Sequence, residues 1–280
     1  MPSLDQTLIN DAAPPGSLRY FALLYTPKER RTELAALYLI ESEIRTSARS
    51  ASHDVAHTRL QWWREEIARL KGGSPQHPAA QALAELSNRV DFRALFDVLT
   101  AAEQDLANAS YEDEHEIVAY LRRSGGSTAE LAASILAAPN SLSDEARESV
   151  RTLGINMRRT EVLRDLRQDA YDGRIYFALP TLARANIQVH ELRQATLTEP
   201  LRALVLDQAE QTRRNLDRSA AELNGSQRIS LRPLLVLASL HARLLGRLQR
   251  ESDDIPQRRI ELGAFEKVWT AWKAAIRARS

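Results

Sequence analysis

Helical patterning runs through almost the whole chain and is interrupted at only a few points. Leucine, alanine, arginine and glutamate dominate the 280 residues, whereas glycine occurs 10 times and proline 11 times. The frequent residues favour helix, and the two helix breakers fall mostly between the periodic segments. The sequence therefore predicts an all-α protein. The expected helices cover residues 17–25, 28–50, 54–71, 76–89, 91–109, 113–137, 143–171, 189–196, 199–223, 230–252 and 257–278.

No linker, internal repeat or low-complexity tract divides the chain into parts. Residues 1–16 form a polar segment and are expected to be a flexible N-terminal arm. Hydrophobic residues make up 44% of the sequence, which suffices for a sizeable core and argues against disorder. We therefore expect one domain over residues 17–280, because a chain of this length fits one large helical domain.

Composition excludes several classes of function. The net charge is +1, from 38 basic and 37 acidic residues, so no overall charge favours nucleic acid. The absence of cysteine excludes disulfides, thiol catalysis and cysteine-ligated zinc. The first residues lack the basic and apolar regions of a signal peptide, and no run approaches the ~18 apolar residues of a membrane span. These features predict a soluble, cytoplasmic protein that does not bind nucleic acid.

The clearest candidate site lies near the end of the helix expected over residues 143–171. Asp165 and Asp169 are four residues apart, which puts both carboxylates on one helical face about one turn apart. A divalent cation could compensate the two like charges, because Mg²⁺ is typically held by one or two carboxylates plus substrate phosphates. The neighbouring Arg158, Arg164 and Arg167 are the other source of positive charge. Which of the two applies decides whether the protein is an enzyme.

The chain then leaves this helix and presents Arg174 and Tyr176. An arginine here could bind phosphate and a tyrosine could donate a hydroxyl, so both extend the candidate site. The pattern alone favours a simpler alternative, in which the charged side chains form a solvated face with internal ion pairs.

The segment from Gly154 to Pro180 resembles the second aspartate motif of the squalene/phytoene synthase family. The matching positions are Gly154, Arg164, Asp165, Asp169, Gly173, Arg174, Tyr176 and Pro180. Further matches follow in the family's order: Ala36-Leu37-Tyr38, Leu60-Gln61-Trp62-Trp63-Arg64-Glu65, His77-Pro78, Asp105, Tyr111, Tyr120 and Ser124-Gly125-Gly126-Ser127. This resemblance covers about residues 17 to 270. It implies the isoprenoid synthase fold, a single all-α bundle with a central cavity.

Active members of this family join two prenyl diphosphates head to head, with Mg²⁺ held between two aspartate-rich helices. For an active enzyme, a transferase of prenyl groups, the resemblance implies that Asp165 and Asp169 hold Mg²⁺. It also implies that these two residues act in catalysis together with Arg174 and Tyr176. The side chains that it implies for diphosphate binding are Arg45, Arg49, Arg158, Arg164 and Arg174.

The first aspartate motif departs from the family's pattern, D-D-x-x-D. Its three aspartates correspond to Arg45, Thr46 and Arg49. In the second motif, the family's Gln and Asn correspond to Arg158 and Glu161. One aspartate pair opposite two guanidinium groups is a poor site for a metal cluster. We therefore expect an arginine–aspartate network in its place, with no cofactor.

The first motif and the segment R-L-Q-W-W-R-E are similar to a divergent branch of the family, the relatives of a mitochondrial complex I assembly factor. The expected function is a catalytically degenerate protein that binds a prenyl lipid or helps to assemble a respiratory complex, with a subunit of that complex as partner. The alternative is a Mg²⁺-dependent head-to-head prenyltransferase of the squalene or phytoene synthase type. A third hypothesis is metal-free binding of a prenyl diphosphate or another isoprenoid lipid, whose anionic end Arg45 and Arg49 would hold.

The last expected helix, over residues 257–278, has one apolar face with basic side chains beside it. Most amphipathic helices pack against their own protein, so we expect this face to pack on the bundle. A basic amphipathic helix with tryptophan also suits a membrane surface, and peripheral membrane contact is the alternative. The apolar residues are Phe265, Val268, Trp269, Trp272 and Ile276, and the basic ones are Lys267, Lys273, Arg277 and Arg279.

Overall fold

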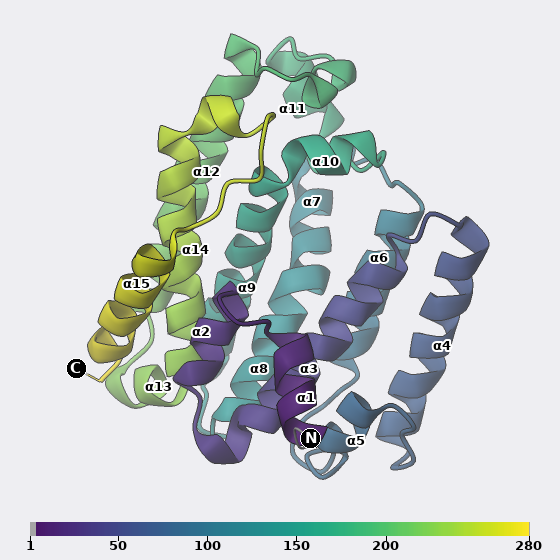
Figure 1. The fold of residues 1–280 in the computed structure, drawn as a ribbon, viewed down its shortest axis with the longest axis vertical. Coiled ribbons are helices and arrows are strands. Elements are labelled where there is room, and N and C mark those ends of the chain that lie inside the picture. The colour runs from purple at the N-terminus through teal and green to yellow at the C-terminus, as the bar shows by residue number, and fades with distance from the viewer. Residues whose placement is uncertain (1–3, 280) are drawn as a thin grey trace.

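The computed structural model describes residues 4–279, and within that range every regular element is a helix (Figure 1). This confirms the predicted all-α class. The α-helices are α1 (Leu4–Ala12), α2 (Leu18–Leu24), α3 (Lys28–Ser47), α4 (His53–Lys71), α5 (Pro78–Ala84), α6 (Ala94–Leu106), α7 (Glu114–Leu121), α8 (Ser127–Leu136), α9 (Asp144–Arg164), α10 (Leu166–Tyr171), α11 (Leu179–Arg184), α12 (Glu199–Ala221), α13 (Gly225–Ser230), α14 (Arg232–Arg250) and α15 (Ala264–Arg277). Short helices of other types are η1 (Arg122–Gly126), η2 (Val189–Arg193) and η3 (Ser252–Asp254).

Two helices carry the candidate site and occupy the middle of the bundle (Figure 1). Helix α9 packs against α8, α12 and α14, and α3 packs against α8, α4 and α6. Apolar side chains are buried around much of α3, as expected for a helix with neighbours on several sides. They point inward and are almost fully enclosed: Leu34, Leu37, Tyr38, Ile40 and Ile44.

The long helix expected over residues 143–171 begins as predicted but is divided near its end. The Ser143 side chain accepts a hydrogen bond from the backbone N–H of Ala146, which caps the start of α9. Asp165 then departs from helical geometry, with φ −98° and ψ 14°, and α10 begins at the next residue. Gly173 follows with φ +85°, in the left-handed region that glycine adopts most easily. The two candidate aspartates therefore lie on different sides of a bend.

A close crossing of two backbones fixes the position of α9. The helix expected over residues 113–137 is interrupted by the π-helical turn η1, whose Gly125 lies against Gly154 of α9. A Cβ added to Gly154 would lie 2.3 Å from the Gly125 carbonyl oxygen and 2.6 Å from the Ala129 Cβ. Only glycine leaves room for this crossing.

The N-terminal segment contains a helix that its composition does not reveal. The sequence predicts a flexible arm over residues 1–16, of which residues 1–3 lie outside the described part of the chain. Helix α1 packs against α3, and Leu8, Ala12 and Ala13 are buried. The flexibility of this segment and the domain boundary at residue 17 stay predictions.

The last helix differs from the expected arrangement. Helix α15 packs against α14 and α2, but its large apolar side chains do not take part in the core. Phe265 is 79% exposed, and Trp269 and Trp272 are each 46% exposed. The contact with α14 is made by small alanine side chains instead. These alanines allow α15 to approach α14 closely. Among residues 4–279, none of the helices is both long and apolar enough to cross a membrane.

Candidate functional site

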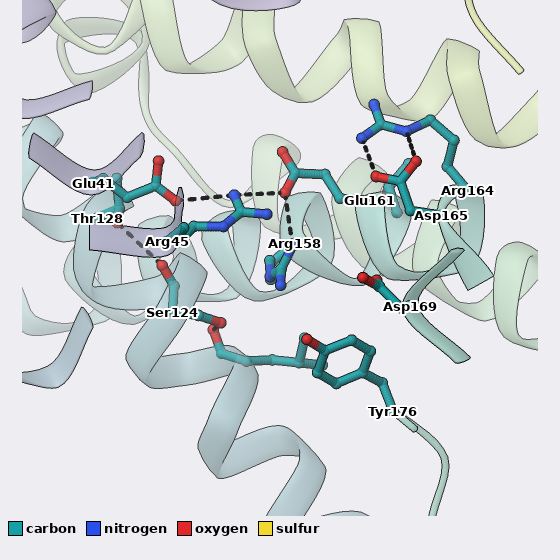
Figure 2. Close-up of polar contacts among 12 residues, drawn as sticks. Glu41, Arg45, Ser124, Thr128, Arg158, Glu161, Arg164, Asp165, Asp169 and Tyr176 are labelled. Atoms are coloured by element: carbon teal, nitrogen blue, oxygen red, sulfur yellow. Dashed lines mark hydrogen bonds and ion pairs between the residues drawn. The ribbon is translucent and has the colours of Figure 1, made fainter. Parts of the chain in front are cut away.

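Two arginines of α3 reach across the bundle to acidic side chains of α9 and α10. Arg45 Nη1 lies 3.0 Å from Glu161 Oε2, and Arg49 Nη2 lies 2.8 Å from Asp169 Oδ1. Arg45 also donates to Glu41 Oε1, one turn earlier on α3, at 3.0 Å. Figure 2 shows the Arg45 guanidinium between the two glutamates. Guanidinium groups thus stand where the resemblance places the first aspartate motif.

A third arginine extends this network toward the N-terminus. Arg19 of α2 forms a short ion pair with Glu41 Oε2 and donates to the Tyr38 carbonyl oxygen at 2.9 Å. Burial alone would raise the pKa of the Glu41 carboxyl, but Arg19 and Arg45 lower that pKa below its usual value. The buried Glu41 is therefore held as a carboxylate between two guanidinium groups.

Glu161 is the centre of the network. It accepts hydrogen bonds from Arg45 at 3.0 Å and from Arg158 at 3.1 Å. The ring of His241 on α14 lies 3.8 Å away. Burial opposes ionisation of Glu161, yet Arg45, His241 and the nearby arginines hold its pKa well below the usual range.

Asp165 and Asp169 do not act as a pair. Asp165 accepts from Arg164 at 2.9 and 2.6 Å and from Arg259 at 2.9 and 3.3 Å. Asp169 instead pairs with Arg49 and, at 3.5 Å, with Arg174. Each of the two carboxylates therefore has its own guanidinium partners.

The two carboxylates also differ in how readily they ionise. Burial would raise the pKa of Asp165, but Arg164 and Arg259 lower it below the usual value. Burial raises the pKa of Asp169, and Arg49 and the other arginines only partly offset that effect. One oxygen of Asp169, Oδ2, is buried and has no hydrogen-bond partner.

Arg158 packs against two buried tyrosines, which are themselves bonded to a buried aspartate. Tyr176 donates to Asp105 Oδ1 at 2.7 Å, and Tyr120 donates to Asp105 Oδ2 at 3.1 Å. Arg158 donates to the Tyr120 hydroxyl at 2.7 Å, and its guanidinium lies 5.8 and 5.7 Å from the ring centres of Tyr120 and Tyr176. The Tyr176 side chain is buried, with 7% of its surface exposed, and its hydroxyl is bonded to Asp105. Its role in catalysis stays a prediction.

The structure brings together most of the residues that the sequence singles out. Two clusters form, Arg45 with Arg158 and Glu161, and Arg49 with Asp169 and Arg174. Pattern analysis did not assign a role to several other members of the site. The sequence marks Asp105 and Tyr120 only as family matches. It gives no usable signal for Arg19, His241 and Arg259, because their partners are distant in sequence, although the i,i+4 spacing of Glu41 and Arg45 could have indicated that pair.

A cavity of about 530 Å³ lies beside the network. Its charged end includes Arg19, Arg45 and Glu161, and a second hollow of about 600 Å³ shares Arg164 and Arg259 with it. Apolar side chains from α9, α14 and the segment before α15 line the rest. These are Met157, Leu234, Leu237, Leu244, Ile260 and Leu262.

The second hollow is strongly basic. We call it the arginine groove and define it by Arg49, Arg164, Arg167, Arg258 and Arg259, which line it together with Asp165. Guanidinium groups match the geometry of phosphate oxygens and remain charged at any physiological pH. A cavity that has an apolar wall and shares two arginines with such a groove suits an amphiphile with an anionic end.

The carboxylates of the site do not suit Mg²⁺, which the fold family implies. Magnesium needs oxygen ligands whose charge is available to it. Glu41, Glu161, Asp165 and Asp169 each contact at least one guanidinium group. No group of three or more His, Asp or Glu side chains within residues 4–279 is placed to hold a metal ion. The carboxylates of this site form ion pairs with guanidinium groups, and their charge is therefore not available to a metal ion.

The ion pairs of Glu161, whose side chain is 21% exposed, predict a change in acid stability. Because folding lowers its pKa below 4.5, Glu161 stabilises the protein above that pH, and the contribution is lost as the pH falls. Asp169, whose pKa is raised, acts in the opposite direction. In Glu161→Gln, the slope of the unfolding free energy against pH should decrease just below pH 4.5 by up to about 1.4 kcal/mol per pH unit. Urea denaturation at a series of pH values measures this slope, and an unchanged slope would contradict the assignment.

Comparison with known proteins gives consistent matches. The family profile described as squalene/phytoene synthase matches residues 14–266. Phytoene synthase of Mycobacterium bovis (strain ATCC BAA-935 / AF2122/97) is 24% identical over 90% of this chain and 84% of that protein. Chloroplastic phytoene synthase of Narcissus pseudonarcissus is 24% identical over 81% of this chain, which spans 55% of that protein. A dehydrosqualene synthase crystallised with a ligand has a similar fold, with a TM-score of 0.80, 19% identity and coverage of 92% of this chain and 90% of the other.

Proposed function

The chain belongs to the squalene/phytoene synthase family, and on that basis we propose that it is a catalytically degenerate member that binds an isoprenoid lipid without metal. The anionic end of the lipid would bind to arginine side chains, and its chain would enter the apolar cavity. The relatives named above are synthases. We therefore propose that this chain shares their fold but does not catalyse their reaction.

One observation carries this proposal. Arg45 and Arg49 replace the carboxylates of the first motif, and they neutralise Glu161 and Asp169 on the opposite side of the site. A metal ion bound there would have to displace guanidinium groups from carboxylates and would then lie beside their positive charge. Both effects oppose metal binding.

The cavity and the arginine groove support the choice of ligand. A volume of about 530 Å³ is within the usual range for a small-molecule pocket. Arg164 and Arg259 line both hollows, so an anion held by them would lie next to the apolar wall. Prenyl diphosphates combine an apolar chain with such an anionic end.

Calorimetric titration with farnesyl diphosphate and farnesol in the presence of EDTA tests this proposal. We expect farnesyl diphosphate to bind at least about tenfold more tightly, because charge-assisted hydrogen bonds contribute ~1.5–3 kcal/mol each. Addition of Mg²⁺ should not increase the affinity. Equal binding of the two ligands would contradict the proposal.

A half-exposed arginine of the groove provides the matched test. Arg259→Gln should weaken the binding of farnesyl diphosphate by about tenfold and leave that of farnesol unchanged. Arg122→Gln is the control, because Arg122 is also half exposed but pairs with Glu148 outside the cavity lining. If both variants lose affinity equally, the effect comes from overall charge and not from the groove.

The alternative function is a Mg²⁺-dependent prenyltransferase, and the retained Asp165, Asp169, Arg174 and Tyr176 are the observations in its favour. A pyrophosphate-release assay with farnesyl and geranylgeranyl diphosphate, with an authentic synthase as control, separates the two functions. We expect no metal-dependent release. Release with a C30 or C40 product would overturn the degenerate assignment. A role in assembling a respiratory complex stays a prediction from the sequence.

A further inference from the structure

Helix α15 has its apolar side chains on the outside. Three aromatic rings form a continuous row on its exposed face: Phe265 stacks on Trp269 at 6.5 Å between ring centres, and Trp269 stacks on Trp272 at 5.0 Å. Val268 and Ile276, also about half exposed, extend the same face. The buried face contains only small side chains, Ala271, Ala274, Ala275 and Ala278. Large apolar side chains in a soluble helix normally make the core contact, so this reversed arrangement needs a partner.

The charges around this face are mostly positive. Residues 264–279 contain four basic side chains and one acidic side chain, although the whole chain has a net charge of only +1. Lys273 Nζ lies 4.9 Å above the Trp269 ring. The one acidic residue, Glu266, is turned toward α14, where it pairs with Arg243 at 2.7 Å and Arg247 at 2.9 Å.

We propose that this face of α15 docks on an anionic lipid bilayer and lies flat in its interfacial layer. Tryptophan is enriched at the level of the lipid headgroups because its ring is apolar and its N–H is polar. Basic side chains beside an apolar helical face attract anionic lipids. The helix has 14 residues, fewer than the ~20 that a membrane span needs, so it lies on the membrane and does not cross it.

Charge complementarity favours a bilayer over a second copy of this chain. A symmetric contact through α15 would bring the basic side chains of both copies together, with no exposed acidic residue of α15 to offset them. An anionic bilayer supplies the opposite charge over the whole face.

The position of the face relative to the cavity fits this orientation. Lys267 of α15 and Leu262 of the preceding segment both line the central cavity. Helix α15 therefore borders the cavity as well as the proposed membrane surface. The docking proposal itself rests only on the exposed face and its charges, and not on the proposed ligand.

Vesicle flotation with the full chain tests the proposal. We expect the protein to float with vesicles of phosphatidylcholine and phosphatidylglycerol, and to bind at least about tenfold more weakly to phosphatidylcholine alone. The combined variant Trp269→Ala and Trp272→Ala should bind the mixed vesicles at least about tenfold more weakly than the unmodified chain. Its thermal unfolding should be unchanged, because both side chains are half exposed. Equal flotation of the variant and the unmodified chain, or flotation of neither, would overturn the proposal.

Two further measurements separate lipid docking from its alternatives. Trp62→Ala is the matched control, since Trp62 is 38% exposed and lies on α4, at the other side of the bundle from α15 (Figure 1). This control should float like the unmodified chain. Sedimentation should show a monomer in both the unmodified chain and the double variant. A dimer that the double variant loses would assign the face to a second copy and overturn lipid docking.

Discussion

Gly154→Ala is expected to lower the free energy of unfolding by at least about 3 kcal/mol, at the upper end for overpacked cores. The added Cβ would lie 2.3 Å from the Gly125 carbonyl oxygen, a backbone atom that cannot rotate away. Helix α9 and the π-helical turn η1 would have to separate. Arg158 lies one turn further along α9, so the movement would also disturb the buried network. Urea denaturation of the purified variant measures the loss.

Gly246→Ala is the matched control for this experiment. Gly246 lies inside α14, and the nearest atom to an added Cβ is the flexible end of Arg250 at 3.8 Å. Since nothing opposes the methyl group, alanine should stabilise the helix by about 0.5–1 kcal/mol. Opposite signs for the two changes are therefore expected. If Gly154→Ala is as stable as the unmodified chain, the two backbones are further apart than described.

The fold could be predicted from local patterns because most of the helices are amphipathic and have recognisable ends. Ser143 and Gly173 mark the two ends of one predicted helix. The pattern failed where tertiary contacts decide the structure. Helix α1 is held by its packing on α3, and α15 has an inverted apolar face that periodicity alone cannot distinguish from a normal one. Periodicity indicates that one face of a helix is apolar. It does not indicate whether that face packs against the core or is exposed.

The candidate site was predicted in part, for a similar reason. The positions of Arg45, Arg49 and Asp169 followed from the alignment of two motifs on facing helices. Asp165 was expected beside Asp169, but the bend at residue 165 turns it to Arg164 and Arg259. The pair of Asp165 with Arg259 joins residues that are 94 positions apart, so no local rule predicts it.

The proposed replacement of a metal cluster by a network of ion pairs would change what the site can bind. A metal site presents positive charge to a ligand and can lose its ion. The guanidinium groups are covalently attached, keep their charge, and remain paired when no ligand is present. An anionic ligand must therefore compete with carboxylates for the same arginines, unless it binds to their outward-facing N–H groups. The half-exposed Arg259 offers such groups at the edge of the cavity.

Arg158→Met is the second large expected effect, with a loss of about 3–5 kcal/mol in the free energy of unfolding. The Arg158 side chain is 3% exposed, contacts Glu161 at 3.1 Å and lies 4.0 Å from Asp105. Methionine fills much of the same volume, so the loss of stability comes mainly from the missing charge and not from a cavity. Asp105 would remain buried and Glu161 partly buried, with one positive charge fewer beside them. Arg122→Met, which removes a half-exposed pair with Glu148, should cost only about 0.2–1 kcal/mol.

A double-mutant cycle tests whether uncompensated charge causes this loss. If it does, adding Glu161→Gln to Arg158→Met should restore part of the stability, because the carboxylate left without its partner is then neutral. The sum of the two single losses should exceed the loss in the double variant by about 1–3 kcal/mol. Strictly additive losses would mean that Arg158 acts through its contacts with Tyr120, Tyr176 and Asp105 and not through Glu161. The network would then be a consequence of the fold, rather than the feature that holds α3 and α9 in register.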